Sequence, residues 1–437
     1  MTGAVSKAGV LLALASLLVY NANLREISSA DTISTRLLPV AVIRDHGVTL
    51  DRYFRDIEPT PYWVQRVGGH YVSSYPILPA LLAVPVYLVP VVLFGDESWS
   101  LLNLLAKVSA SLFAALSVTL VYLAARRVAP ERHGPGAPVA VALIYAFGTS
   151  TWSVASQGLW GHGPAQLFMA AAIYAALRGA VDGRFFAASG LAAGLMVASR
   201  PTTILVAAAL LAYGLRRDLP SGIRGVVGFG AATAPVVLYN VRYFGSLQGG
   251  YGHVIALQET IHGVAGAWST PLGEGLLGLL LSPSRGLLVY SPILALAVVG
   301  VVSSVALPRG HLLHYLALGL GASLLVLGKY SVWWAGHSFG PRLLGDFLPA
   351  LAVFFVPIWG RLTRRRAGRA LVLVLFAVSV AVQLVGAFYY PSPREVDWNT
   401  SPRPVGLSRH RLWDWEDSQI LRLVRNGPRL PGFGSGG

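Results

Sequence analysis

Long apolar segments, separated by short loops that carry arginine, constrain this chain more than any other feature of its sequence. Of its 437 residues, 54% are hydrophobic and only 12% are charged, whereas soluble domains carry about 25% charged residues. This composition excludes ordinary soluble, disordered and disulfide-stabilised classes of protein. The sequence therefore predicts an all-α polytopic membrane protein with about eleven transmembrane helices of about 20 residues each.

The net charge of +15 comes almost entirely from arginine, because lysine occurs only at Lys7, Lys107 and Lys329. In a soluble protein such a charge suggests nucleic-acid binding. Here many of the arginines lie in short loops between apolar segments, the placement expected of cytoplasmic anchors against anionic lipid. We therefore expect membrane lipids, and no nucleic acid, among the partners. The chain has no cysteine, which excludes thiolate chemistry and Cys-ligated metals.

The positions of the arginines predict the orientation of the helices. If the segment 77–94, which contains Pro79, Pro85 and Pro90, lies in the membrane interface, the arginine-bearing short loops all fall on the cytoplasmic side. If that segment crosses the membrane, these loops all fall on the outer side. We therefore predict an interfacial 77–94 and a cytoplasmic N-terminus in the plasma (inner) membrane. The spans are expected at 6–21 (uncleaved), 101–124, 139–157, 164–178, 185–199, 200–215, 222–240, 286–304, 312–328, 344–360 and 369–388.

This topology leaves the large polar regions on the outer side of the membrane. Residues 1–390 are expected to form one transmembrane domain, with outer loops at 22–100 and 241–285. The loop 22–100 is long enough to carry interfacial helices. Residues 391–437 form a short outer tail rich in proline, arginine and glycine. Nothing sizeable faces the cytoplasm, so any chemistry is expected on the outer side.

Asp31 is the candidate catalytic residue. It directly follows the first span, and Arg36 lies five residues further on. A carboxylate at the membrane edge can accept a proton from an acceptor hydroxyl or amine, with Arg36 orienting it or binding substrate. The same residue can instead be the N-cap of a helix over Thr32–Leu38. His70, in a Gly-Gly turn, can bind a phosphate or sugar, or simply be a solvated loop residue.

Three arginines sit beside proline or glycine at predicted outer span ends: Arg200, Arg285 and Arg342. A charge at membrane depth usually has a partner or a function, and a guanidinium suits phosphate oxygens. The alternative is that each arginine extends to the lipid headgroups. Asp346 is the only other acid near this face, and we expect it to pair with Arg342.

Aromatic, amide and histidine side chains gather at the same span ends. Aromatic belts at membrane interfaces account for most such tryptophans and tyrosines, but sugar-binding sites also use aromatic faces. The candidates for substrate binding in this group are His162, Asn240, Tyr243, Trp334 and His337.

The order of these motifs resembles that of the GT-C membrane glycosyltransferases, in particular glycosyltransferase family 39, which includes protein O-mannosyltransferases and lipid A aminoarabinose transferases. The resemblance covers most of residues 10–360. It is carried by Ser29-Ala30-Asp31-Thr32, by Tyr239-Asn240 with Tyr243-Phe244-Gly245-Ser246, by Leu281–Pro292, and by Trp333-Trp334 with Gly340-Pro341-Arg342.

The resemblance implies a GT-C fold, a polyprenyl-phosphate sugar donor and inverting transfer at the outer membrane face. It implies that Asp31, the loop acid after the first span, acts as the base or orients the acceptor. The protein mannosyltransferases have adjacent Asp-Glu where this chain has Ala30-Asp31. The acceptor therefore stays open between a glycan, a lipid and a protein. No cofactor or metal ligand is expected, and the need for a divalent metal is left open.

A transporter or flippase of a lipid-linked or anionic solute is the alternative function. It would use the same interfacial arginines. It would also favour ionisable residues near mid-membrane and internal pseudo-repeats. Apart from charged residues at the span ends, only Lys107 lies within a predicted span, near its outer end, and no repeat is visible.

Overall fold

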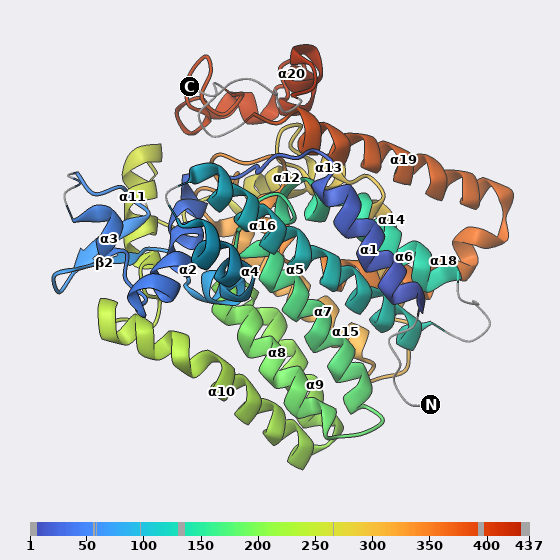
Figure 1. Ribbon diagram of the computed structural model, residues 1–437. Helices are drawn as coiled ribbons and strands as arrows, with labels where there is room; N and C mark the ends of the chain where they lie inside the picture. Colours follow the sequence, from blue (N-terminus) through green and yellow to red (C-terminus); the bar gives the residue numbers. More distant parts are fainter. Residues whose placement is uncertain are drawn as a thin grey trace.

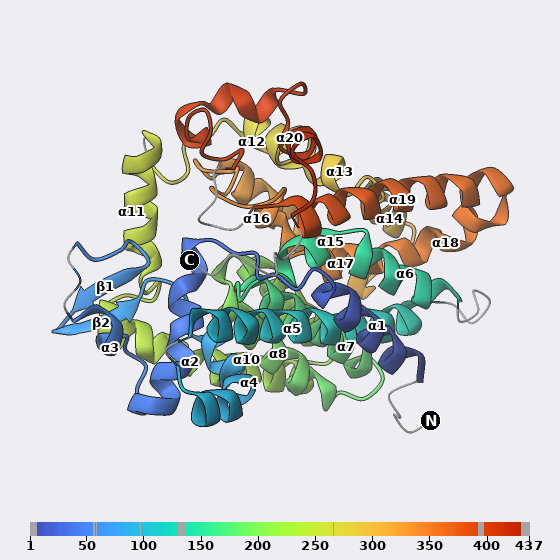
Figure 2. The same cartoon turned by 45° about the horizontal axis from the view of Figure 1, so that its top comes forward.

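The protein is an all-α polytopic membrane protein. A computed structural model describes residues 7–55, 57, 59–96, 98–129, 136–264, 266–391 and 397–429. In this part the only sheet is an antiparallel hairpin of β1 (Val64–Val67) and β2 (His70–Ser73), in which Val64 pairs with Ser73. Figures 1 and 2 show the start of α1 (Lys7–Asn21) on the opposite side of the molecule from this hairpin and from α11 (Tyr251–His262).

Four of the described helices are long and apolar enough to cross a membrane, judged by length and composition. They are α5 (Trp99–Val128), α10 (Leu219–Phe244), α15 (Leu312–Lys329) and α19 (Arg366–Tyr389). Six shorter apolar helices accompany them: α1 (Lys7–Asn21), α4 (Leu78–Phe94), α6 (Gly136–Phe147), α8 (Phe185–Ser199), α12 (Leu272–Leu281) and α14 (Leu294–Ser304). Besides α11, the remaining α-helices of the described residues are α2 (Ile33–Asp45), α3 (Asp51–Phe54), α7 (His162–Gly179), α9 (Ile204–Arg217), α13 (Leu287–Tyr290), α16 (Arg342–Gly345), α17 (Leu348–Val353), α18 (Phe355–Arg364) and α20 (Gln419–Asn426).

Two of the predicted spans are interrupted by breaks near proline. The predicted span 286–304 consists of α13 and α14, and α13 ends just before Ser291-Pro292 because proline disfavours a helical residue in front of it. The predicted span 344–360 consists of the end of α16, all of α17 and most of α18. Pro349 stands in the first turn of α17, where its missing N–H costs nothing.

The three prolines of segment 77–94 do not break it. Pro79 lies in the first turn of α4, and Pro85 and Pro90 are accommodated inside a continuous helix. The buried face of α4 packs against α2 and α5. The Arg44 guanidinium donates a hydrogen bond to the carbonyl of Val91, at 2.7 Å. The interfacial position of α4 in the membrane stays a prediction.

Glycines bring α8 and α10 into backbone contact. A Cβ added to Gly190 would lie 1.8 Å from the carbonyl oxygen of Gly225, and one added to Gly194 would lie 2.6 Å from that of Phe229. Small residues allow such close approach, which drives helix association where lipid is the solvent. This contact fixes α8, whose C-terminal end at Ser199 leads directly into the candidate site.

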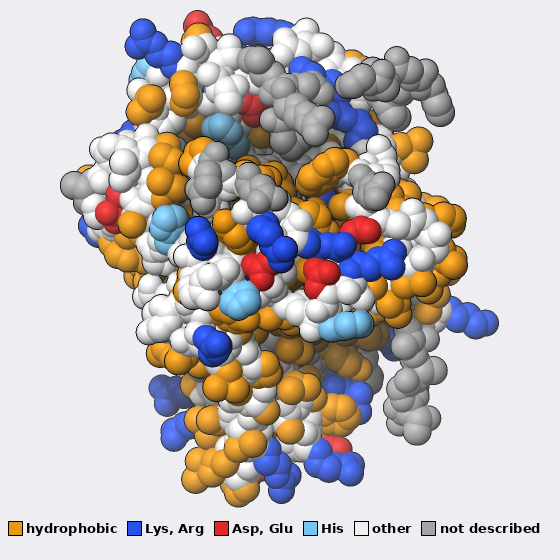
Figure 3. Space-filling model, turned by 60° about the vertical axis from the view of Figure 1, so that its left-hand side comes forward, with side chains coloured by type: hydrophobic (Ala, Val, Ile, Leu, Met, Phe, Trp, Pro, Cys, Tyr) orange, Lys and Arg blue, Asp and Glu red, His pale blue; other side chains and the backbone are white. Residues whose placement is uncertain are grey.

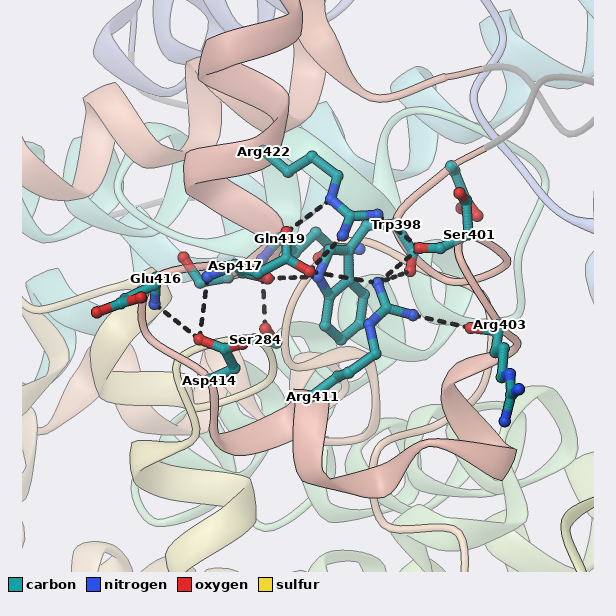
Figure 4. Close-up of polar contacts among 12 residues, drawn as sticks. Ser284, Trp398, Ser401, Arg403, Arg411, Asp414, Glu416, Asp417, Gln419 and Arg422 are labelled. Carbon is teal, nitrogen blue, oxygen red and sulfur yellow. Dashed lines mark hydrogen bonds and ion pairs between the residues drawn. The ribbon is translucent and has the colours of Figure 1, made fainter.

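The described part of the predicted tail, residue 391 and residues 397–429, is held together by Arg411. Figure 4 shows its guanidinium pointing at the backbone of Trp398, Ser401 and Arg403, to whose carbonyl oxygens it donates hydrogen bonds of 2.7–2.8 Å. The guanidinium also stacks 4.6 Å from the centre of the Trp398 ring. The tail therefore has an internal polar framework; its assignment as a separate outer segment stays a prediction.

Candidate functional site

A cavity of about 830 Å³ lies between the 3-10 turn Ala30–Thr32, the N-terminal ends of α7 and α9, helix α11 and the C-terminal end of α15. Its lining is largely apolar, with four charged or titratable side chains gathered at one end and Glu259 of α11 elsewhere in the wall. The charged end contains Asp31, His162, Arg200 and Arg342, whereas α9 and α15 contribute aliphatic side chains. Figure 3 shows basic, acidic and histidine side chains gathered around a hollow on the face that carries α11 and the hairpin.

Asp31 points its side chain at partners across the cavity. Its Oδ1 accepts a hydrogen bond from Tyr62 Oη at 2.6 Å, and its Oδ2 accepts one from Arg342 Nη1 at 2.8 Å. The residue that caps the 3-10 turn is Ser29, and the N-cap of α2 is Thr32, which makes no side-chain cap bond. The alternative role of Asp31 as a helix N-cap is therefore wrong, because its carboxylate is already engaged elsewhere.

The charge of Asp31 is stabilised in this position. Burial alone would raise the pKa of its carboxyl, but the Arg342 guanidinium and the Tyr62 hydroxyl together lower that pKa below its ordinary value. Burial, followed by the Asp31 charge, raises the pKa of the neighbouring Tyr75 hydroxyl, which stays protonated. Asp31 is therefore a carboxylate at neutral pH, surrounded by hydrogen-bond donors.

Arg342 is anchored independently of Asp31. Its Nη2 donates to the carbonyl oxygen of Ala335 at 2.7 Å, and its guanidinium lies 4.8 Å from the centre of the Trp160 ring. Ala335 has a φ of +60°, a conformation that costs a non-glycine residue about 1–2 kcal/mol. This strained residue turns its carbonyl toward Arg342, and such strain is typical of functional sites.

A second carboxylate, Asp346, is buried behind the cavity wall with no exposed side-chain surface. Its Oδ1 accepts from His162 Nδ1 at 2.6 Å, and its Oδ2 accepts from Arg200 Nε at 3.1 Å. Thr202 adds a weaker bond at 3.3 Å. The expected pairing of Asp346 with Arg342 is wrong, since Arg342 pairs with Asp31 and Asp346 pairs with Arg200. Because Nδ1 of His162 faces the carboxylate, Nε2 is the ring nitrogen available to the cavity.

Arg36 is separated from this site by its own partners. Its guanidinium pairs with Glu26 at 3.0 Å, donates to Ser28 at 2.9 Å and also donates to Asn103. Arg36 is 6% exposed, does not line the cavity and makes no bond with Asp31. The structure therefore does not support Arg36 as the residue that orients Asp31: Glu26, ten residues earlier, holds it instead.

Arg285 is the third predicted phosphate ligand, and it is enclosed by backbone. Its Nε donates to the carbonyl of Trp334 at 2.8 Å, and its Nη atoms donate to Gly336 at 3.0 Å and to Gln419 at 3.2 Å. It is 1% exposed and does not line the cavity. This placement assigns it to the attachment of the C-terminal tail rather than to substrate.

An Arg285→Ala variant is therefore expected to lose stability and keep its affinity for phosphate-bearing lipids. Several buried carbonyl oxygens would lose their donor, which costs about 1–3 kcal/mol for each unsatisfied group. Thermal unfolding in detergent measures the stability, and lipid binding to the folded fraction measures the affinity. Normal stability with lost lipid binding would return Arg285 to the substrate site.

The other predicted binding residues also lie away from the large cavity. His70 is exposed and bonds Asp51 at 2.7 Å, and Asn240 donates to the Leu247 carbonyl at 2.9 Å. Tyr243 packs against Tyr239, with ring centres 4.8 Å apart. The remaining candidates do not line the large cavity, although Asn240 lines a neighbouring cavity of about 110 Å³. These candidates are His70, Asn240, Tyr243, Trp334 and His337.

Sequence reasoning missed the residues that complete the site. Tyr62 and Tyr75 come from the irregular loop before and after the hairpin, where no periodic pattern marks them. Tyr75 makes an edge contact with Tyr251, whose hydroxyl accepts from Arg200 at 3.2 Å. Within the described residues, no group of three or more His, Asp or Glu side chains is arranged to hold a metal ion.

No protein-family model matches the chain, and a search of curated proteins finds no match either. Among solved structures, the chain is similar to the crystal structure of the Archaeoglobus fulgidus oligosaccharyltransferase in its apo form, with a TM-score of 0.47 and 14% sequence identity. The superposition covers 98% of this chain and 61% of that one. The chain thus spans about three-fifths of the length of the archaeal protein.

Proposed function

We propose that this protein is a membrane glycosyltransferase of the GT-C type, which moves a sugar from a polyprenyl-phosphate donor to an acceptor at the outer face of the membrane with inversion. One observation carries the proposal. A carboxylate that follows the first helix meets a guanidinium from residue 342 at the charged end of a cavity whose remaining walls are largely apolar. The motif order of the sequence supports the same assignment.

Each part of the cavity suits one part of such a donor. The aliphatic side chains of α9 and α15, including Leu205 and Val326, can contact the polyprenyl chain. Arg342 can bind the phosphate, because a guanidinium fits phosphate oxygens in a bidentate way. In the transfer step, the acceptor oxygen bonds to the anomeric carbon while the bond from that carbon to the phosphate oxygen breaks. The electron pair leaves with the phosphate, and Asp31 takes the acceptor proton.

The test is mass spectrometry of lipids that copurify with the protein, followed by a single-turnover transfer assay with the donor thus identified. A polyprenyl monophosphate sugar that is present in the wild type and depleted in an Arg342→Gln variant is the expected result. Movement of the intact lipid across vesicles, without cleavage of its sugar, would instead identify a flippase. An Arg52→Gln variant is the matched control, because Arg52 pairs with Asp96 outside the cavity.

The outer orientation of the site gives a separate prediction. The chain lacks cysteine, so single cysteines can be introduced at Val181, 83% exposed between α7 and α8, and at Leu247, 71% exposed after α10. An impermeant maleimide is expected to label Leu247→Cys on intact cells and Val181→Cys only after the membrane is opened. The reverse labelling pattern would place the cavity on the cytoplasmic side.

A further inference from the structure

Two carboxylate–guanidinium pairs lie in and behind the cavity wall, and they differ in how firmly the carboxylate is held. Asp346 has no exposed side-chain surface and accepts from Arg200, His162 and Thr202. Asp31 borders the cavity directly, and its carboxylate accepts hydrogen bonds from Arg342 and Tyr62. The side chains of Asp31 and Arg342 keep 16% and 11% of their surface exposed. The first pair is a fixed part of the wall, and the second faces the space that a ligand would fill.

Both members of the second pair have anchors that do not depend on each other. The Ala335 carbonyl and the Trp160 ring hold the Arg342 guanidinium in place, and the Tyr62 hydroxyl holds Asp31. The Nη1 edge of Arg342 can therefore exchange its anionic partner while the Ala335 carbonyl and the Trp160 ring still hold the guanidinium and the Tyr62 hydroxyl still holds Asp31. A phosphate that enters the charged end of the cavity competes with Asp31 for this same edge.

We propose that the donor phosphate binds by displacing Asp31 from Arg342, an inference that rests on the proposed function. The displaced carboxylate of Asp31 then takes the proton of the acceptor. A carboxylate paired with a guanidinium is a weak base, because the positive charge favours its ionised form. Once the phosphate neutralises Arg342, Asp31 binds a proton more readily. The base thus becomes effective only when a donor occupies the cavity.

This exchange predicts an unusual effect on binding. In the resting protein Asp31 competes with the ligand, so removal of its charge should strengthen the binding of an anionic lipid. The probe is undecaprenyl phosphate, titrated into the full chain in lipid nanodiscs. We expect Asp31→Asn to bind it about 10-fold more tightly than the wild type, the equivalent of one charge-assisted hydrogen bond.

Three further variants isolate the cause of this gain. Arg342→Gln should bind the probe more weakly, and adding Asp31→Asn to it should bring no improvement, because the competition needs Arg342. Asp51→Asn removes the same charge from the same outer loop, where Asp51 pairs with His70 outside the cavity, and should leave binding unchanged. Asp31→Ser repeats the main measurement should the Asn variant prove unstable.

The outcomes separate the two proposals. If the wild type binds undecaprenyl phosphate and the Asp31 variants bind it equally or more weakly, the exchange is wrong and the proposed function stands. If neither the wild type nor any variant binds the probe above the level of empty nanodiscs, the polyprenyl-phosphate donor itself is wrong, and the exchange fails with it. A gain in Asp31→Asn that persists without Arg342 would also overturn the exchange.

Discussion

An Asp31→Asn variant is expected to fold, to bind donor lipid and to transfer sugar about 10²–10⁴-fold more slowly than the wild type, the usual loss when a general base is removed. Asparagine keeps the size of the side chain and can still accept the hydrogen bond from Tyr62, so the cavity keeps its shape. It cannot take the acceptor proton. Single-turnover transfer at saturating donor measures the loss without interference from altered binding.

The stability of the same variant provides the control. The pKa of Asp31 is lowered in the folded protein, so its ionised form stabilises the fold. That contribution is complete above the pKa of an unfolded aspartate and is lost as the pH falls through the lower folded-state value. The difference in unfolding free energy between wild type and variant should thus stay constant from about pH 6 to 8 and shrink only below about pH 4. Full transfer activity in the folded variant would remove Asp31 from the catalytic machinery.

An Asp346→Ala variant is expected to lose about 3–5 kcal/mol of stability, because it leaves the largely buried Arg200 without its counter-charge. Asp346 is fully buried, and the Arg200 side chain is 15% exposed. His162 would lose its Nδ1 acceptor in the same change. Thermal unfolding in a single detergent, compared with the wild type, measures the loss.

The Arg200→Ala/Asp346→Ala double variant tests the cause of that loss. With both charges removed, no unpaired charge stays buried, so the double variant should be less destabilised than the sum of the two single variants. Strictly additive losses would mean that the two residues contribute through packing rather than through their ion pair. His162→Ala offers an independent reference for the loss of the other hydrogen bond.

The class of fold could be predicted from the sequence, because the bilayer requires apolar spans and favours arginine in the cytoplasmic loops. One predicted segment, 185–199, has the same bounds as α8. Other segments were predicted with the wrong bounds, because hydrophobicity does not show where a helix breaks. The predicted span 139–157, for example, contains the end of α6 at Phe147 and a separate turn over Thr151–Ala155.

The candidate site was predictable only in part, because span ends show which residues share a side of the membrane but not which of them meet. Asp31, His162, Arg200 and Arg342 do line one cavity, and their roles stay predictions. Arg36 carried the same sequence signal, yet a local partner, Glu26, holds it elsewhere. Asp346 and its partner His162 are 184 residues apart, and no pattern in the chain links them.

The bond between Asp31 and Arg342 joins positions 311 residues apart, and this sets a condition on biosynthesis. At translation rates of 5–20 residues per second, roughly 15–60 s separate the synthesis of the two residues. During that interval Asp31 has no guanidinium from residue 342, while Arg36 and Glu26 are already both present. A ribosome-bound chain can therefore form this local ion pair before the residues that complete the cavity, Arg342 and Leu343, have been made. Under the proposed function, a nascent chain that ends before Arg342 lacks the residue that is proposed to bind the donor phosphate, so it cannot take donor lipid away from finished molecules.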